Sequence, residues 1–346
     1  MKKFVFCLCV ALLTTISSEA QQISVVSPSG TTTLFRTLQE SIEGADPGSV
    51  IYLPGGGFQI SDEVKITNKK LTIIGIGHYA NNGNADGVTT ISGNLFFNEG
   101  SSGSAVIGCY ITGNVYIGEG GASVNDVLIR QCNLNSVQVT NSSCVDTEIN
   151  QNYIRSTSSF SGANGKITNN IIHSINNISN GGQISNNLIL GSFQYNSYST
   201  GHWSNPTRHY DYCSVLAYNS IVSNNFTTQK PNSWGGGSTW NSYVVLGGSG
   251  NGTSSNYGFG DDPIDIGEVE DWNKVFKNYN GGAISPASDF HFTDDYKQYE
   301  NQVGIYGGTG FNKQVTSVPY IIYKDVPTET DAQGMLKVKI RVKANQ

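Results

Sequence analysis

The sequence has 346 residues and is poor in charge, because only 13 % of them are Asp, Glu, Lys or Arg. The formal net charge is −6, and basic residues are scarce between Leu71 and Asn273. Nucleic acid binding needs many contacts from Lys and Arg to phosphates, so this composition argues against a nucleic acid partner. Hydrophobic residues still make up 37 % of the chain, in short regular runs. The pattern predicts a folded β protein with turns of Gly and Asn rather than a disordered chain.

Residues 1–20 are typical of a secretory signal peptide. Lys2 and Lys3 form its basic start, an apolar stretch follows over 4–16, and Ser-Glu-Ala at 18–20 forms the cleavage site. The apolar stretch is too short to span a bilayer, and no later segment is long enough. We therefore expect a secreted protein (extracellular, cell-surface or periplasmic) that has no membrane span once this peptide is removed.

The first folded elements follow at 35–53. Phe35, Leu38 and Ile42 have helical spacing and share one face. Pro47-Gly48 ends this pattern, and short strands separated by Gly and Asn turns begin at Val50. One helix followed by many short strands predicts a capped stack of strands.

From about Ala105 a six-residue pattern recurs at steps of roughly twenty residues, with no helical segment between the copies. The first and last positions of the pattern are aliphatic in nearly every copy. The copies are 106–111, 129–134, 149–154, 167–172, 184–189 and 222–227. Such steps are typical of a solenoid whose strands stack in parallel.

The fourth position of each copy carries a Cys or an Asn. These residues are Cys109, Cys132, Asn152, Asn170, Asn187 and Asn225. A polar side chain at an inward bend must be hydrogen-bonded, so we expect the Asn side chains to stack as a ladder. The two Cys are expected to act as small buried apolar groups.

These features resemble the pectate-lyase-like superfamily of right-handed parallel β-helices, whose second turn often carries an asparagine ladder. Residues 35–56 resemble its capping helix and first strand, and VGIYGGTGF at 303–311 resembles the end of the coil in secreted bacterial members. The resemblance implies an all-β fold: a right-handed parallel β-helix over 21–312 with a short N-terminal capping helix and C-terminal strands. This fold hosts lyases, hydrolases, esterases and non-catalytic surface proteins, so it leaves the activity open.

Residues 313–346 form a C-terminal β segment. Pro319 to Asp325 reads as a strand, and Met335 to Val342 alternates apolar and basic residues as a half-buried strand does. The segment either packs back on the coil, which we favour, or forms a small module.

Two long segments, 192–212 and 228–243, interrupt the regular coil, and the sequence predicts loops there. Consecutive rungs lie side by side, so both loops should emerge together, and long loops on a rigid scaffold commonly carry function. Their aromatic rings can stack on sugars or can simply cover the coil. The candidate ligand-binding residues are His202, Trp203, Tyr210, Trp234 and Trp240.

The densest group of ionisable residues is Arg-His-Tyr-Asp at 208–211. His209 can exchange a proton near neutral pH, and Asp211 can orient it. Arg208 can bind a uronate carboxylate or act as a base, as the resemblance to lyases implies. Arg208, His209 and Asp211 are therefore the candidate catalytic residues of a polysaccharide lyase or glycoside hydrolase. A solvated loop with an internal Arg–Asp contact is the alternative.

Other ionisable residues give weaker signals. Carboxylates at 260–272 offer oxygens to Ca²⁺, but their spacing matches no dedicated calcium loop and also fits a short helix. Glu148 and Lys166 share a column on neighbouring rungs and predict an exposed ion pair. His78, His173 and His291 are isolated in sequence, and no spacing predicts zinc. The motifs of polygalacturonases, pectate lyases and pectin esterases are absent from the sequence.

The sequence therefore predicts a secreted, monomeric, glycan-active β-helix protein. It would bind a polysaccharide or surface glycan through segments 192–212 and 228–243, and as an enzyme would cleave it. The alternative is a non-catalytic structural or adhesive protein of the cell surface. Neither hypothesis requires a cofactor, and Ca²⁺ is the one metal that the sequence leaves open.

Overall fold

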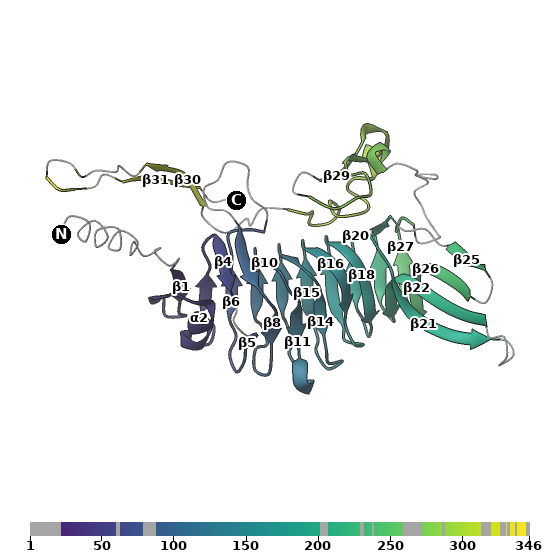
Figure 1. The fold of residues 1–346 in the computed structure, drawn as a ribbon, viewed down its shortest axis with the longest axis horizontal. Coiled ribbons are helices and arrows are strands. Elements are labelled where there is room, and N and C mark those ends of the chain that lie inside the picture. Colours follow the sequence, from purple (N-terminus) through teal and green to yellow (C-terminus); the bar gives the residue numbers. More distant parts are fainter. Residues whose placement is uncertain are drawn as a thin grey trace, which may run out of the picture.

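The computed structural model describes residues 22–59, 63–78, 88–200, 207–228, 232–236, 239–258, 272–285, 288–312, 320–325, 330, 333–335 and 338–343. Through these residues the chain is mostly β and winds as a long coil of short parallel strands (Figure 1). The coil is built from an eleven-stranded sheet and a sixteen-stranded sheet. Among the described residues, no helix has the length and apolar character needed to cross a membrane.

A strand hairpin and one helix close the N-terminal end of the coil. These elements are β1 (Ile23–Val26), β2 (Thr32–Phe35) and α2 (Leu38–Gly44). The Thr37 side chain accepts a hydrogen bond from the backbone N–H of Glu40, whose carboxylate accepts one from the N–H of Thr37. This capping box starts the helix. Leu38 and Ile42 are buried in the core of the coil, which confirms the predicted helix.

The eleven-stranded sheet forms one side of the coil. After β1 and β2 its strands are β3 (Val50–Tyr52), β6 (Thr72–Ile74), β9 (Ala105–Ile107), β12 (Leu128–Arg130), β15 (Thr147–Asn150), β17 (Gly165–Thr168), β19 (Gln183–Ser185), β23 (Ile221–Ser223) and β27 (Gly252–Ser254). From β3 onward all neighbours pair in parallel, so each strand places the same position of its repeat inside. Ile129, Ile149 and Ile167 occupy this position and are fully buried.

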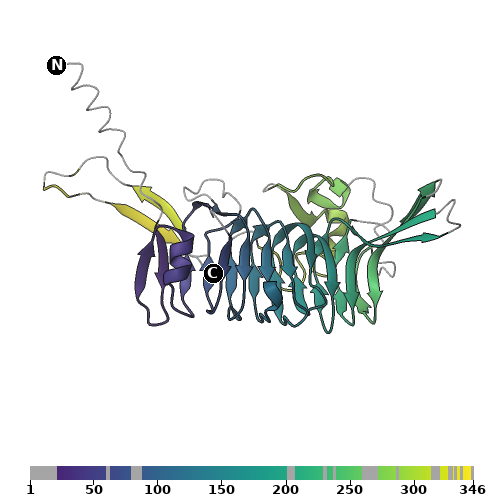
Figure 2. The same ribbon diagram turned by 60° about the horizontal axis from the view of Figure 1, so that its bottom comes forward.

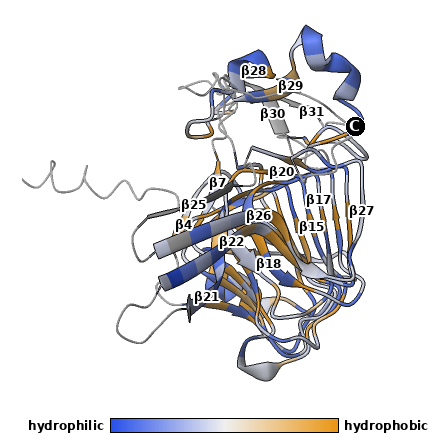
Figure 3. Cartoon of the chain, turned by 90° about the vertical axis from the view of Figure 1, so that its right-hand side faces the viewer, coloured by the Kyte–Doolittle hydropathy of each residue, from blue (hydrophilic) through white to orange (hydrophobic). Residues whose placement is uncertain are grey.

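The sixteen-stranded sheet forms the remaining sides. Its strands are β4 (Gly56–Gln59), β5 (Val64–Ile66), β7 (Thr89–Ser92), β8 (Leu95–Phe97), β10 (Tyr110–Ile111), β11 (Val115–Ile117), β13 (Asn133–Leu134), β14 (Val137–Val139), β16 (Tyr153–Ser159), β18 (Ile171–Ile178), β20 (Leu188–Ile189), β21 (Phe193–Thr200), β22 (Thr207–Tyr218), β24 (Phe226–Thr227), β25 (Asn232–Gly236) and β26 (Thr239–Ser249). Figure 3 looks along the coil and separates β15, β17 and β27 of the first sheet from β18, β22 and β26 of the second.

The predicted asparagine ladder is present inside the bend between the two sheets. Each Asn donates from Nδ2 to Oδ1 of the Asn one rung further on, over 3.0, 3.0, 2.9 and 3.0 Å. The ladder runs through Asn152, Asn170, Asn187, Asn225 and Asn256. Asn256 lies in a seventh copy of the pattern, at 253–258, which the sequence pattern missed because Thr253 and Gly258 replace the aliphatic ends.

Cysteines take the ladder position in the preceding rungs. Cys109 and Cys132 are fully buried, and their thiols donate to backbone carbonyls of the coil. Burial raises the pKa of the Cys132 thiol to about 12, so it behaves as an inert apolar group, as predicted. Cys144 and Cys213 are also buried, and all four cysteines are free.

A C-terminal cap covers the outer surface of the last rungs. Its elements are the 3-10 helix η2 (Trp272–Lys274), β28 (Phe276–Asn278), β29 (Asp289–Phe292) and the 3-10 helix η3 (Asp294–Tyr299). Phe276, Phe290 and Phe292 of the cap form a second apolar cluster with outward side chains of the coil, including Ile171 and Phe226. In Figure 1 the cap lies above the end of the coil that carries β20 and β27.

The last elements are β30 (Tyr320–Asp325) and β31 (Lys339–Lys343). They pair antiparallel as a two-stranded sheet that is not hydrogen-bonded to the sheets of the coil. The two predicted C-terminal strands are therefore present. The choice between packing on the coil and forming a small module stays a prediction.

Candidate functional site

The two segments predicted as loops form β-hairpins where the structure describes them. β21 pairs antiparallel with β22, β25 pairs antiparallel with β26, and β22 and β26 run parallel side by side. The prediction that both segments emerge together is confirmed, but the loop conformation was wrong. Aromatic residues and Thr favour strands, and strand pairing satisfies the backbone hydrogen bonds of a segment that leaves the coil. Figure 2 shows both hairpins projecting past the end of the coil.

Only part of the predicted ligand-binding group lies in described residues. His202 and Trp203 fall in 201–206, outside them. Trp234 and Trp240 lie on β25 and β26, where their backbone is described. Tyr210 lies on β22 and is partly exposed. A shared aromatic surface therefore stays a prediction.

The predicted catalytic residues all lie on β22, but they do not converge. Side chains alternate along a strand, which places His209 and Asp211 on one face and Arg208 on the other. The His209 ring stacks on Tyr198 at 4.8 Å, and its Nε2 lies 2.9 Å from Thr200 Oγ1. These contacts join β22 to β21.

Asp211 is held between the neighbouring strands. Its carboxylate accepts hydrogen bonds from Ser242 Oγ at 2.7 Å and from Asn196 Nδ2 at 3.2 Å. In the described residues it makes no ion pair with Arg208. Asp211 thus links β21, β22 and β26.

A groove of about 360 Å³ lies elsewhere, on the outer face of β12, β15, β17 and β19. Two rows of outward side chains form its floor. Glu148, Lys166 and Gln183 occupy one row, because they face one another in the register of neighbouring strands. The second row is Arg130, Asn150, Thr168 and Ser185. The floor is therefore polar and carries two cations and one carboxylate.

The charged groups of the groove are not neutralised by each other. Glu148 and Lys166 are paired in register, but the structure places their charged atoms more than 4.0 Å apart, so the predicted ion pair was wrong. The Nε of Arg130 is buried and has no hydrogen-bond partner among the described residues. Because Arg130 lines the groove, its guanidinium can meet an acceptor that a ligand supplies there.

One wall of the groove comes from residues 303–312, which we call the return segment. It runs back along the coil from the cap. Gly304 donates from its N–H to the carbonyl of Asn224, and Gln151 Nε2 donates to the carbonyl of Gly310 at 2.8 Å. Gly308 and Thr309 line the groove itself. The return segment therefore determines the width of the groove.

Asn169 and Asn186 hold the centre of the return segment. Asn169 Nδ2 donates to the carbonyls of Ile305 and Gly307, and its Oδ1 accepts from Thr309 Oγ1. Asn186 is only 7 % exposed, and its Nδ2 has no partner among the described residues. A Cβ on Gly307 would lie 2.1 Å from this Nδ2, so a larger residue here would require the Asn186 side chain or the return segment to move. Asn186 also lines the groove.

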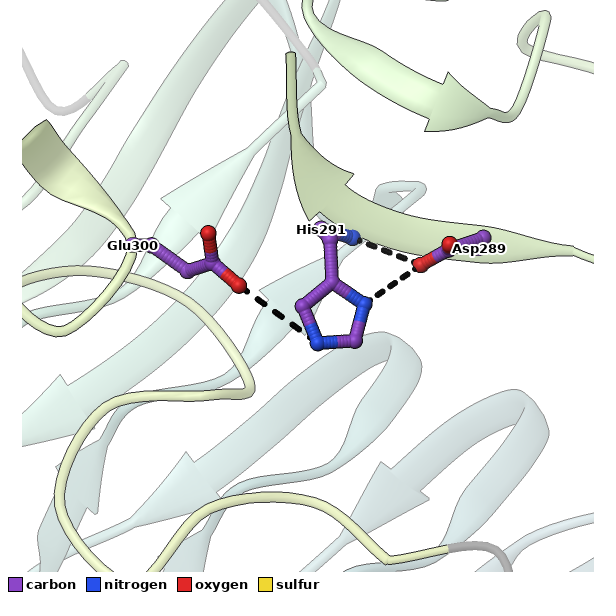
Figure 4. A network of polar contacts seen from close by, with 3 residues as sticks. All are labelled: Asp289, His291 and Glu300. Atoms are coloured by element: carbon purple, nitrogen blue, oxygen red, sulfur yellow. Dashed lines mark hydrogen bonds and ion pairs between the residues drawn. The ribbon is translucent and has the colours of Figure 1, made fainter. Parts of the chain in front are cut away.

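A third polar cluster lies in the cap (Figure 4). His291 was predicted to be isolated, but its Nδ1 lies 2.6 Å from Asp289 and its Nε2 lies 3.4 Å from Glu300. The ring also stacks on Tyr306 of the return segment at 3.8 Å. Burial acts to raise the pKa of Asp289, but hydrogen bonds from His291 and the nearby charge of Lys277 lower it overall.

Metal binding was left open by the sequence. In the described residues, no group of three or more His, Cys, Asp or Glu side chains is arranged to hold a metal ion. The acidic stretch proposed for Ca²⁺ lies at 260–272, and of this range only Trp272 is described. A calcium site there stays a prediction.

The groove therefore combines a defined volume with convergent polar groups. Comparisons of the chain with protein-family models, curated proteins and solved structures found no match.

Proposed function

We propose that this protein is a secreted polysaccharide-binding protein whose coil is a right-handed β-helix of the pectate-lyase-like kind. The ligand is an acidic polysaccharide, and it binds in the groove on β12, β15, β17 and β19. The observation that carries the proposal is the pair of cations, Arg130 and Lys166, that flank Glu148 on successive strands.

The charge distribution supports an anionic ligand. The chain has a net charge of −6. Of the few basic residues between Leu71 and Asn273, Arg130 and Lys166 both line the groove. A guanidinium binds a carboxylate through paired N–H groups, and an ammonium binds it as a point charge. Cations gathered in a groove of an acidic protein favour an anion over a neutral sugar.

The direction of the groove supports a polymer. Neighbouring strands of a sheet lie about 4.8 Å apart, so Arg130 and Lys166, two strands apart, are separated by about 10 Å along the coil. A chain lying along the coil would meet a similar row of donors at each strand. The Asn150 amide donates to Thr168 Oγ1 within the floor, whereas the exposed amide of Gln183 can bond sugar hydroxyls.

The hairpins offer a separate surface. Tyr195 and Tyr198 on β21 are 38 % and 47 % exposed, and exposed rings can stack on sugars. However, the hairpins extend the sixteen-stranded sheet, whereas the groove lies on the eleven-stranded sheet. The two surfaces can therefore be tested by separate variants.

The test is binding of residues 21–346 to polygalacturonate and to a neutral polysaccharide, with and without Ca²⁺, by titration calorimetry. Reducing ends and unsaturated uronate products are followed in the same samples. The variant Arg130→Gln/Lys166→Gln should bind polygalacturonate at least about tenfold more weakly, since each lost charge-assisted bond contributes about 1.5–3 kcal/mol. The matched control, Arg36→Gln/Lys65→Gln, removes the same charge outside the groove and should bind normally.

Equal binding by the groove variant and the control would overturn the proposal, as would equal affinity for the neutral polysaccharide. If the unaltered protein binds no polysaccharide, the structural or adhesive function replaces it. Unsaturated products would add lyase activity to the proposed binding, and reducing ends alone would add hydrolysis.

A further inference from the structure

His291 is placed between two carboxylates in a way that depends on its protonation (Figure 4). Its two ring nitrogens face Asp289 at 2.6 Å and Glu300 at 3.4 Å. A neutral imidazole carries one N–H, whereas an imidazolium carries two. Both contacts are favourable only when both nitrogens carry a proton, so the geometry fits the protonated ring.

The charged and titratable groups around this ring come from the cap and from the return segment. Asp289 lies on β29 with His291, Glu300 follows η3, and Tyr306 belongs to the return segment. Lys277 on β28 adds positive charge next to Asp289. The ring thus joins the cap to the return segment.

The stack on Tyr306 is directly connected to the groove. Gly307, the next residue, lies against Asn186, and Gly308 and Thr309 follow it as the groove wall. The groove wall therefore follows Tyr306 directly in the chain, which is the route by which a shift of this residue would reach the wall. Small shifts are transmitted in this way because packed interfaces deform little.

We propose that protonation of His291 holds the return segment against the coil, and that the groove binds its ligand more weakly when this proton is lost. The inference rests on the proposed function of the groove. On deprotonation the proton leaves one ring nitrogen for solvent, and a lone pair then faces a carboxylate. Glu300 is only 17 % exposed, so its charge loses a donor that solvent replaces poorly.

The first test measures polygalacturonate binding at about pH 5.5 and about pH 8, on either side of the range in which an imidazole ordinarily titrates. We expect binding by the unaltered protein to be about two- to fivefold weaker at the higher pH, as for a partly exposed ion pair. His291→Gln should bind equally at both values. His173→Gln removes a partly buried imidazole on β18, outside the groove, and should keep the pH dependence.

Glu300→Gln covers the case in which His291→Gln does not fold. It retains the ring and an acceptor but removes the charge that favours the imidazolium, so the pH dependence should shrink. An unchanged pH dependence in either folded variant would overturn the inference.

A second readout needs no ligand. Hydrogen exchange at the backbone N–H of Gly304, which donates to the carbonyl of Asn224 on the coil, reports how firmly the return segment is held once it is corrected for the intrinsic effect of pH. Protection should fall between about pH 5.5 and pH 8 in the unaltered protein but not in His291→Gln. Absence of that fall would overturn the inference while leaving the proposed function intact. A fall in protection without polysaccharide binding would overturn the proposed function and leave the role of His291 intact.

Discussion

Two columns of amide side chains run along the same bend of the coil, one residue apart, and they act on opposite sides of the backbone. The inner column is the ladder of Asn152, Asn170, Asn187, Asn225 and Asn256, whose amides bond one another and the coil. The outer column consists of Gln131, Gln151, Asn169, Asn186 and Asn224. Members of the outer column contact the return segment instead. The inner column thus stabilises the coil itself, and the outer column holds the return segment on the surface of the coil.

The backbone conformation explains why the two columns diverge. Asn169 and Asn186 have φ values of 55° and 57°, in the left-handed region. One such residue turns the chain sharply, so its side chain points out while the next points in. Asn tolerates this conformation better than other residues with a Cβ, because its short polar side chain can bond locally. The same residue type therefore serves both columns for different reasons.

The largest effect is expected from breaking the inner column with Asn170→Ala. Asn170 donates to Asn187, Ile149 and Thr168 and accepts from Asn152, all inside the coil. Its loss leaves several buried groups without partners, which costs about 3 kcal/mol or more. Urea unfolding followed by circular dichroism should show this loss for the whole coil. A loss below about 1 kcal/mol would mean that the ladder is replaceable.

A smaller and more local effect is expected from the outer column. Asn169→Gly removes the side-chain bonds to the return segment but keeps the left-handed backbone, whereas Asn169→Ala also adds about 1–2 kcal/mol of backbone strain. Both should weaken polygalacturonate binding, and only the Ala variant should measurably destabilise the coil in urea. Equal urea unfolding curves for the two variants would show that the left-handed backbone at position 169 adds no strain to the Ala variant.

The next prediction concerns the close approach between the outer column and the return segment. Gly307→Ala places a Cβ within 2.1 Å of Asn186 Nδ2, so either the Asn186 side chain or the wall must move. Overpacking of this kind costs about 1–3 kcal/mol, and we expect it to loosen the contact between the return segment and the coil. Hydrogen exchange at the N–H of Gly304, which bonds Asn224 on the coil, should accelerate. Gly252→Ala, which meets nothing within 4 Å, is the control and should leave exchange unchanged.

The sequence predicts the inner column much better than the outer one. In each rung an Asn stands at a fixed distance from an aliphatic residue, and this pattern can be read locally in the sequence. It predicts directly that Asn170 and Asn187 belong to the ladder. Asn169 and Asn186 stand beside them in the sequence, but Asn169 bonds Ile305, 136 residues away. No local pattern marks a partner at that distance.

The cap had one signal that pattern reasoning passed over. The fifth position of the repeat points outward, and it changes from Tyr110 and Asn133 in early rungs to Leu188 and Phe226 in later ones. An outward position that becomes apolar predicts a covering layer. The groove is not predicted for another reason: the shared column of Glu148 and Lys166 follows from the repeat, but opposite charges in register predict an ion pair rather than a site for a ligand.

The smallest expected effect is a pH dependence of the contact between the return segment and the coil, because this contact adjoins a titratable carboxylate and the inner column contains none. The pKa of Asp289 is lowered in the folded protein, so its stabilising contribution is present above the ordinary value of 3.8 and is lost as pH falls through the folded pKa. Asp289 is 40 % exposed, so solvent screening keeps the effect below about 1 kcal/mol. Exchange protection of Gly304 should therefore fall in acid, and Asp289→Asn should remove most of that fall. The destabilisation caused by Asn170→Ala should not vary with pH, because no amide titrates. If the difference in Gly304 protection between Asp289→Asn and the unaltered protein did not change with pH, the outer amides alone would hold the return segment. The charged cluster of the cap would then contribute nothing.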